Sequence, residues 1–378
     1  MNEENMSDKP LSQGGGSKYK KRFDWLDISK GIAILAVIFG HTLENDSFGR
    51  AIFYSFHMPL FFILAGFTFR VKPRKDVIKS TFFTLGLPYI LMAFLGMVRN
   101  FLGGSWYEEL SVWHLIKEYV LFFFNPIASA SIAQKWGIMS EAHIWMGKMF
   151  TPHNYAYGII WFILVLSFAR VFLNEIMMQL EKFSFSSLRA KMFFYTGSAL
   201  IFLFAGIKFV PVFRFVFPFE LDLVLIATGY MLLGYVAKNV HLVETLLKRW
   251  YVIPLFFLAW YVLLIRGVRL DMGVRHFSSP VLSLVLSLVS SIVILALSTV
   301  VEKIGSLPIL AWVKSFFVWA GKNSLLIYFV HSLDGVVAWF HIFVFDELTN
   351  HPMYYVAVAR VVYVVIFSYV LYRAARRI

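Results

Sequence analysis

Three ionisable side chains are predicted to share one face of a single apolar helix near the start of the chain. In the run DISKGIAILAVIFGH (27–41), Lys30 precedes His41 by eleven residues, and Glu44 follows His41 by three. Eleven residues of α-helix cover about 16.5 Å and end about 20° from a whole number of turns, so the ammonium and the imidazole point the same way. A histidine with a carboxylate partner suits general base catalysis, and a distant cation suits an anionic ligand.

A second candidate group begins the next apolar run, FHMPLFFILAGF (56–67). Pro59 leaves a backbone carbonyl without its helical partner and is expected to kink the helix, which would bring His57 toward His41. His57 would then donate a hydrogen bond to an oxyanion formed during a reaction. A position at the lipid headgroup boundary, beside aromatic residues, explains His57 equally well.

A third group lies on the run GKNSLLIYFVHSLD (321–334). Ser324, Tyr328 and His331 fall at helical positions i, i+4 and i+7 and form a polar stripe, and Asn323 and Asp334 form a neighbouring one. Ionisable groups in an apolar helix cost about 2.5 kcal/mol or more to insert, so they are candidates for function. Hydrogen bonding between helices is the alternative explanation.

Charged residues also gather in segments predicted to lie at the outer mouth of the helices. Glu220 and Asp222 precede an apolar run, and Asp222 is a candidate substrate contact. The neighbouring loops carry further charged groups, namely Arg214, Arg266, Arg269, Asp271, Arg275 and His276. The alternative explanation is that these charged residues form a solvated rim without a role in binding.

The composition requires that helices position these groups within a membrane. Of 378 residues, 59% are hydrophobic and only 15% are charged, with 35 basic residues against 22 acidic ones and no cysteine. A soluble domain is about one quarter charged, so the chain is predicted to be a polytopic membrane protein. Because lipid offers no partner for open backbone groups, we expect an all-α transmembrane bundle. The missing cysteines exclude disulfides and a cysteinyl intermediate.

About ten spans are predicted from the apolar runs: 28–47, 51–70, 78–99, 155–173, 192–213, 220–237, 251–266, 280–301, 316–334 and 354–372. With a cytoplasmic N-terminus, every inner loop is basic, as the positive-inside rule expects. The net charge of +13 is therefore mainly an orientation signal, and no nucleic-acid partner is expected. We predict a multi-pass plasma membrane protein with both termini cytoplasmic.

Two segments fall outside this series of spans. Residues 1–22 are expected to be a flexible, basic cytoplasmic tail that is not a signal peptide, preceding one transmembrane domain at 23–378. The apolar stretch 113–125 is too short to span and is predicted to be a re-entrant or interfacial helix in a large outer loop, 100–154. Four tryptophans of this loop suit either sugar stacking or interfacial anchoring: Trp106, Trp113, Trp136 and Trp145.

The sequence resembles acyltransferase family 3, the integral-membrane O-acyltransferases, and in particular its stand-alone, fucose 4-O-acetylase-like branch. Four pieces carry the resemblance in the family's order: DISKGIAILAVIFGH, FHMPLFFILAGF, YGIIWFILVL (157–166) and GKNSLLIYFVH. The family has an arginine where this chain has Lys30, which keeps the charge but loses the bidentate fork. The usual serine and glycine of the second piece are Ala65 and Gly66 here.

The resemblance implies transfer of an acyl group, commonly acetyl from cytoplasmic acetyl-CoA, to a hydroxyl of a glycan or glycolipid. His41, with Glu44 and His57, would carry the catalysis, directly or through an acyl-histidine. Further residues would bind the two substrates: Lys30, Asn323 and Ser324 the donor; Trp161, Asp222, Tyr328 and His331 the acceptor. Some relatives add an outer esterase-like domain; none follows here, so we expect transfer to be completed within the membrane domain.

Other functions remain open from the residues alone. A transporter or flippase for a glycan or lipid-linked sugar would also need many spans and buried polar groups, although internal repeats are not detected here. A scaffold without catalysis would leave Lys30 as a lysine snorkelling at a helix end and His41 as a packing residue. No metal and no bound cofactor are expected.

The Lys30 position gives a first testable prediction. If the donor site needs only a positive charge, Lys30→Arg retains acyl transfer while Lys30→Ala loses it, because arginine also places a cation there. Acyl transfer in cells with equal amounts of each variant measures this. Equal activity of Lys30→Ala and the unchanged protein would contradict a donor-binding role.

Overall fold

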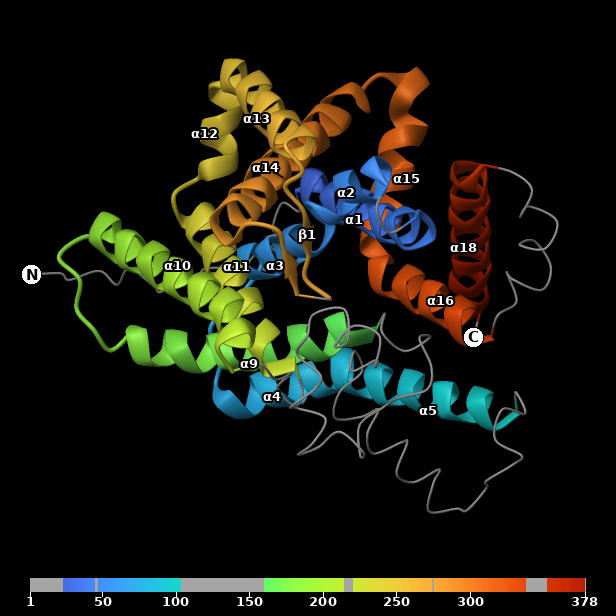
Figure 1. The fold of residues 1–378 in the computed structure, drawn as a ribbon, viewed down its shortest axis with the longest axis horizontal. Coiled ribbons are helices and arrows are strands. Elements are labelled where there is room, and N and C mark those ends of the chain that lie inside the picture. Colours follow the sequence, from blue (N-terminus) through green and yellow to red (C-terminus); the bar gives the residue numbers. More distant parts are fainter. Residues whose placement is uncertain are drawn as a thin grey trace, which may run out of the picture.

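The structure, a computed structural model, describes residues 23–44, 47–102, 160–213, 220–273, 275–337 and 352–377 (Figure 1). Its elements, in chain order, are α1 (Asp24–Thr42), α2 (Phe48–Tyr54), α3 (His57–Phe67), α4 (Arg74–Thr81), the π-helical η1 (Phe82–Gly86), α5 (Leu87–Leu102), α9 (Trp161–Leu180), α10 (Leu188–Phe213), α11 (Leu221–Asn239), α12 (Leu242–Lys248), the 3₁₀ turn η5 (Trp250–Val252), α13 (Ile253–Ile265), β1 (Leu270–Asp271), β2 (His276–Phe277), α14 (Pro280–Ile304), the 3₁₀ turn η6 (Pro308–Leu310), α15 (Ala311–Lys322), α16 (Ser324–Val337) and α18 (Met353–Ala375). The tail 1–22, the helix predicted at 113–125 and the four outer tryptophans lie outside the described residues.

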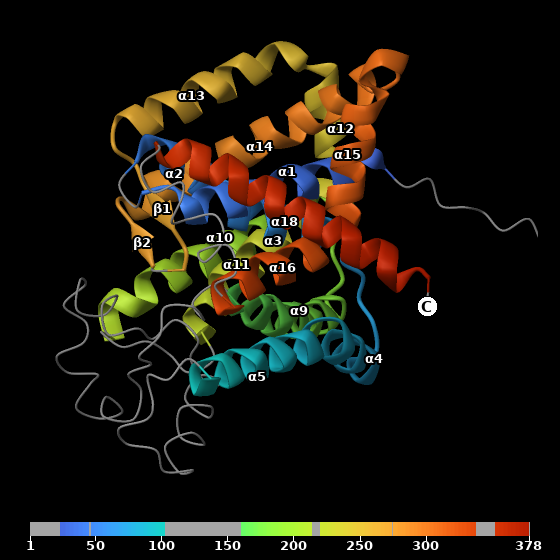
Figure 2. The ribbon, with the colours of Figure 1, turned by 90° about the vertical axis from the view of Figure 1, so that its right-hand side faces the viewer.

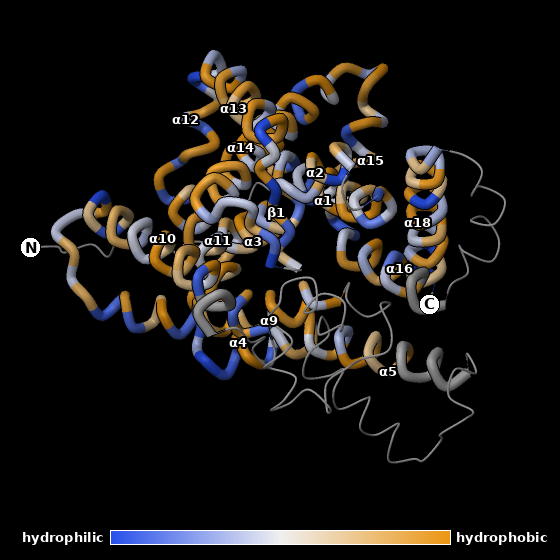
Figure 3. The backbone as a smooth tube through the Cα atoms, viewed as in Figure 1, coloured by the Kyte–Doolittle hydropathy of each residue, from blue (hydrophilic) through white to orange (hydrophobic). Residues whose placement is uncertain are grey.

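The prediction of an all-α polytopic bundle is confirmed. In the described part of the chain, eight helical segments are long and apolar enough to cross a membrane, and each overlaps a predicted span. The two remaining predictions coincide with shorter apolar helices, Trp250–Ile265 and Ser324–Leu333. Hydrophobic residues run along most of the helices, whereas hydrophilic ones concentrate around α4 and the β1 turn (Figure 3).

The helix that carries Lys30 and His41, α1, occupies the centre of the bundle. It contacts α2, α3, α14, α15, α16 and α18. Glycines allow the tightest of these approaches: a Cβ at Gly321 would lie 1.7 Å from the carbonyl oxygen of Asp27, and one at Gly31 would lie 2.4 Å from that of Phe317. Such contact between backbones is typical of membrane helices and fixes α1 against α15.

The bundle has two distinct ends (Figure 2). One end carries the start of α1, together with α4, α12 and the C-terminal end of α18. We call it the basic end, because its segments hold Arg70, Lys72, Arg74, Lys75, Lys248, Arg373 and Arg376. The opposite end carries α2 and the two-stranded antiparallel hairpin of β1 and β2, which we call the hairpin end. His41, in the last turn of α1, belongs to the hairpin end.

The second predicted span is broken into α2 and α3, not merely kinked. The break falls at Ser55 and Phe56, just before the segment containing Pro59. Proline has no N–H to donate to the carbonyl of Ser55, and the hydroxyl of Ser290 on α14 donates to that carbonyl instead at 3.1 Å. The carbonyl that faces Pro59 therefore keeps a hydrogen-bond donor, and the break turns His57 into the first residue of a new helix.

The ninth predicted span, 316–334, is also two helices and not one. α15 ends at Lys322, and α16 begins at Ser324 with a change of direction (Figure 1). Asn323 lies between them with non-helical dihedral angles, and its side-chain amide donates to the carbonyl of Trp319 at 2.8 Å. Asn323 therefore closes the end of α15, so the three consecutive polar residues Lys322, Asn323 and Ser324 mark a helix boundary inside the predicted span.

Glycines also fix the crossing of α3 and α11. A Cβ at Gly66 would lie 1.7 Å from the carbonyl oxygen of Met231, and a Cβ at Gly234 would lie 1.9 Å from that of Ile63. Both obstacles are backbone atoms, which cannot rotate out of the way. Gly66, the glycine of the run FHMPLFFILAGF, is therefore a packing requirement of the helix that begins with His57.

Gly66→Ala is predicted to destabilise the protein by about 1–3 kcal/mol, because the two helices must separate to admit a methyl group. Gly197→Ala on α10 is the matched control, since a Cβ there would have nothing within 4 Å. Thermal denaturation in detergent, followed by size-exclusion chromatography, compares the two. A midpoint for Gly66→Ala equal to that of Gly197→Ala would contradict the tight crossing.

Candidate active site

Two histidines from distant parts of the chain meet at the hairpin end of the bundle. The rings of His41 on α1 and His331 on α16 lie with their centroids 5.6 Å apart and their planes inclined by 33°. α16 runs from Ser324 to His331 in the same sense as α1 runs from Lys30 to His41. Two of the predicted site residues are thus brought together by helices that are nearly 300 residues apart in the chain.

His331 is the less satisfied of the two side chains. It is fully buried, and neither of its ring nitrogens has a hydrogen-bond partner among the described residues. A buried polar atom without a partner costs about 1–3 kcal/mol, and such atoms persist where a ligand supplies the missing bond. The two rings are also too far apart to stack closely. The geometry suits a small reacting group held against both imidazoles.

The partner of His41 is a tyrosine and not the predicted carboxylate. The hydroxyl of Tyr54, in the last turn of α2, lies 3.1 Å from Nδ1 of His41. The expectation that Glu44 continues the same helix face is wrong, because α1 ends at Thr42 and Leu43 is extended. Glu44 is exposed, and within the described residues no ion pair joins it to His41. Helix boundaries are the least certain feature of sequence analysis.

His57 lies behind Tyr54. Its ring meets the Tyr54 ring edge to face, with centroids 4.7 Å apart, and the ring of His41 meets the same tyrosine at 5.8 Å. Nδ1 of His57 donates to the carbonyl of Phe53 at 2.7 Å, since a carbonyl only accepts. That bond leaves Nε2 of His57 as an acceptor when the ring is neutral. His57 is therefore a buried support for Tyr54, and its predicted catalytic role stays a prediction.

Lys30 lies toward the basic end, two thirds of the length of α1 away from His41. Its ammonium is partly exposed and lies 4.0 Å from the buried carboxylate of Asp27. The hinge between α15 and α16, with Asn323 and Ser324, follows Gly321, which packs on the Asp27 backbone. The structure thus places Asn323 and Ser324 near the part of α1 that carries Lys30. The side-chain amide of Asn323, however, already donates to the carbonyl of Trp319.

Trp161 on α9 and Tyr328 on α16 are both buried. The Trp161 indole lies against Gly273 of the hairpin turn, where a Cβ would be 3.1 Å from its nitrogen. Tyr328 lies one helical turn before His331, and its ring contacts Phe162 with centroids 5.9 Å apart. Of the two predicted acceptor contacts, Tyr328 therefore adjoins the histidine pair and Trp161 adjoins the hairpin turn, and both are enclosed by neighbouring side chains.

Asp222, predicted to bind substrate, has a different partner. Its carboxylate accepts two bonds from the guanidinium of Arg275, at 2.8 and 3.1 Å, and Glu220 pairs with the same guanidinium. All three groups are buried. Burial opposes the charge of Arg275, but the two carboxylates outweigh this effect and raise the pKa of the guanidinium. This cluster, Glu220–Asp222–Arg275, anchors the hairpin turn to α11 and is not a solvated rim.

Three site residues escaped the sequence analysis: Arg50, Tyr54 and Arg360. Arg50 and Tyr54 lie at i and i+4 on the short α2, directly before His57. Arg360 lies about two turns from the start of the apolar α18 and acts electrostatically on both His41 and His331. A cation within a membrane span is a signal of function, and the predicted span 354–372 contained it.

The site does not resemble a metal centre. In the parts of the chain that the structure describes, no three histidine, aspartate or glutamate side chains lie close enough together to hold a metal ion. Two facing imidazoles, a phenol and nearby guanidinium groups are suited to proton transfer and to stabilising negative charge.

The fold and the site define a polytopic α-helical membrane protein with ionisable side chains enclosed between its helices. A family model described as an acyltransferase domain matches residues 23–373, nearly the whole chain. The chain belongs to this family, acyltransferase family 3, and is a membrane acyltransferase. No curated protein and no solved structure was found to match the chain.

Loss of the Arg275 guanidinium is predicted to be strongly destabilising. Arg275→Gln would leave two buried carboxylates without a cation, and removing one partner from a buried ion pair costs about 3–5 kcal/mol. Arg266→Gln, at an exposed position after α13, is the matched control. The yield of folded protein and its thermal midpoint check this. Equal midpoints for the two variants would contradict the anchoring role.

Proposed function

We propose that the protein moves an acetyl group from cytoplasmic acetyl-CoA to a hydroxyl of a cell-surface glycan or lipid-linked sugar. The observation that carries this proposal is the pair of facing imidazoles of His41, which is half-buried, and His331, which is buried and lacks any hydrogen-bond partner among the described residues. In a membrane acyltransferase, such a pair suits a hydroxyl and a thioester carbonyl that react between them.

In the proposed mechanism, His41 is the general base. Its Nε2 removes the proton of the acceptor hydroxyl while the oxygen attacks the thioester carbonyl, and the new C–O bond gives a tetrahedral intermediate. When this intermediate collapses, the C–S bond breaks and the protonated His41 returns its proton to the leaving thiolate, which departs as the free thiol of coenzyme A. His331 supplies a hydrogen bond to one of the reacting groups, and the charge of Arg360 favours the oxyanion of the tetrahedral intermediate. An acyl-histidine intermediate is the alternative route.

The basic end suits a donor that carries phosphates. Lys30, with Asn323 and Ser324 at the hinge, is the proposed contact on α1. A separate pocket of about 780 Å³ lies at the same end. Its lining includes three cations, Arg70, Lys72 and Lys238, one carboxylate, Glu181, and the aromatic Phe69 and Tyr235. The carbonyl and amide groups of the Lys72 backbone both bond to the buried side chain of Asn174, which fixes this loop against α9. Cationic and aromatic groups around such a volume suit a nucleotide.

The proposed setting is the plasma membrane, with both termini cytoplasmic and lipid around the bundle. The start of α1 and the end of α18 lie at the same, basic end, in agreement with the positive-inside rule (Figure 2). The acceptor would then approach from the hairpin end, where Trp161, Tyr328 and His331 are the proposed contacts. Family membership favours transfer over the transporter or flippase alternative.

His41→Gln is predicted to reduce acetyl transfer by about 10²–10⁴-fold, because glutamine keeps polarity and volume but cannot take the proton. His331→Gln should also reduce acetyl transfer sharply, since it removes the second imidazole. Membranes containing equal amounts of each variant are incubated with radiolabelled acetyl-CoA, and label in the envelope glycan fraction is counted. Mass spectrometry of surface glycans with and without the gene identifies the acceptor by its missing acyl increment.

His241→Asn provides the control for this experiment. His241 is exposed in a turn at the basic end, in a left-handed conformation that asparagine also adopts. Its activity should equal that of the unchanged protein. If His41→Gln were equally active, His41 would not be the base.

A further inference from the structure

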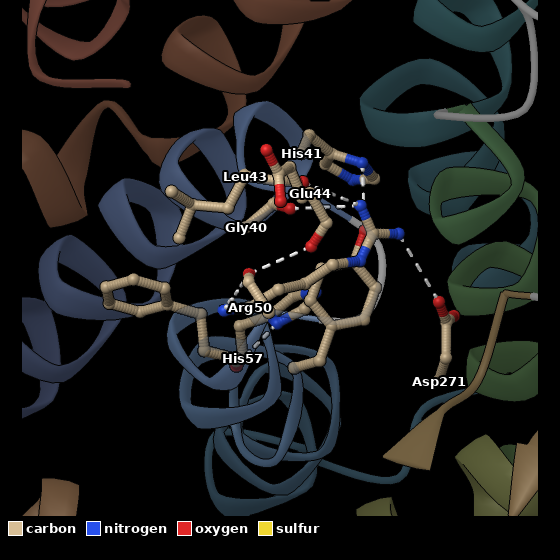
Figure 4. A network of polar contacts seen from close by, with 10 residues as sticks. Gly40, His41, Leu43, Glu44, Arg50, His57 and Asp271 are labelled. Carbon is tan, nitrogen blue, oxygen red and sulfur yellow. Dashed lines mark hydrogen bonds and ion pairs between the residues drawn. The ribbon is translucent and has the colours of Figure 1, made fainter. Parts of the chain in front are cut away.

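The guanidinium of Arg50 joins three parts of the hairpin end (Figure 4). One of its nitrogens donates to the carbonyl of Gly40 in the last turn of α1, at 3.2 Å, and to that of Leu43 directly after the helix, at 3.4 Å. A second nitrogen lies 3.6 Å from the carboxylate of Asp271 on β1. The planar group also lies over the ring of Tyr54, with its central carbon 4.1 Å from the ring centroid. Arginine alone among the cations offers this fork together with a stacking face.

Tyr54 is held by these contacts in a single position. Its ring packs on Gly40, where a Cβ would come within 2.8 Å of a ring carbon, so no larger residue fits at that position without displacing the tyrosine. Arg50 covers one face of the ring, and His57 meets it edge to face. The buried hydroxyl then lies 3.1 Å from Nδ1 of His41.

Asp271 belongs to a rigid part of the protein. The hairpin that carries it pairs Leu270 with Phe277 and is closed by Arg269, whose carbonyl accepts from Ser283 of α14 at 2.8 Å. The turn is tied to α11 by the Glu220–Asp222–Arg275 cluster. A carboxylate on such a frame gives Arg50 a fixed reference point, although their separation of 3.6 Å makes it a loose ion pair.

We infer that Tyr54 is a positioning residue for His41, and that Arg50, held by Asp271, fixes both Tyr54 and the end of α1. This inference rests on the proposed function, since it assigns the orientation of the base. For Nε2 of His41 to accept a proton, Nδ1 must carry the hydrogen and donate it to the Tyr54 oxygen. When the imidazole becomes charged, that bond becomes charge-assisted and strengthens. Tyr54 thus replaces the carboxylate that orients the histidine in many hydrolases.

The first test removes only the hydroxyl. Tyr54→Phe keeps the ring, its packing on Gly40 and its contact with Arg50, and the rate of acetyl transfer from radiolabelled acetyl-CoA should fall by about 10²-fold, with an unchanged KM for acetyl-CoA. Tyr230→Phe is the matched control: Tyr230 is buried, and its hydroxyl also makes one side-chain bond, 2.7 Å long, to Ser287 on α14. Its transfer rate should equal that of the unchanged protein.

The second test asks whether Arg50 and Asp271 act as one unit. Arg50→Gln and Asp271→Asn are made singly and together, and transfer rates are compared per amount of folded protein. If Asp271 acts through Arg50, Asp271→Asn alone lowers the transfer rate. Added to Arg50→Gln, it changes the transfer rate of that variant by less than about twofold. Arg50→Lys, which keeps the charge without the fork, should recover only part of the loss. If the loss of rate in the double variant equals the product of the two single losses, the two residues act independently and the link between Asp271 and Arg50 is overturned.

A spectroscopic readout separates positioning from folding. In protein labelled with ¹⁵N-histidine, the His41 ring signals, assigned by their loss in His41→Gln, should change tautomer balance in Tyr54→Phe and stay unchanged in Tyr230→Phe. If His41→Gln is inactive while Tyr54→Phe has the full rate and unchanged signals, the inference fails and the proposed function stands. If His41→Gln is itself fully active, the proposed base assignment fails first.

Discussion

Every polar group within a bilayer needs a partner inside the protein, because lipid supplies none. Most of the buried polar groups in the described part of this chain have such partners, and many of these partners are distant in sequence. Ser290 bonds to the carbonyl that Pro59 leaves free, Asn174 bonds to both backbone groups of Lys72, and Arg275 neutralises two carboxylates. These contacts hold the helices at fixed positions, so the few groups left without partners stand out.

His331 is the group that stands out most, and its position defines the site. Within the described residues, neither nitrogen of this fully buried imidazole has a hydrogen-bond partner, and this lowers stability in a way that a leucine or phenylalanine there would not. Its neighbour, His41, has one nitrogen bonded to Tyr54 and the other available. Since the chain belongs to an acyltransferase family, we propose that the two substrates supply the hydrogen-bond partners that these ring nitrogens lack.

Sequence analysis predicted the helices well because membrane spans depend on local composition, which is visible in the chain. It also identified the face shared by Lys30 and His41, because a helix of known pitch places them. It failed at helix ends: Glu44 lies beyond the end of α1, and the polar segment around Asn323, taken as part of one span, is the boundary between α15 and α16. It also failed to predict partners, since Asp222 and Arg275 are 53 residues apart in the chain and only the fold brings them together. Arg50 and Tyr54 were overlooked because their importance arises from what they contact.

The length of α1 between Lys30 and His41 has a consequence for transport. Eleven residues of helix cover about 16.5 Å, roughly half of the ~30 Å hydrocarbon layer. A donor held at Lys30, as proposed, would deliver its acyl group half-way across the bilayer while its phosphates stay on their own side. The acceptor would need to reach only the other half. The acyl group would then cross the membrane by changing its covalent partner, and no charged molecule would have to pass through the lipid.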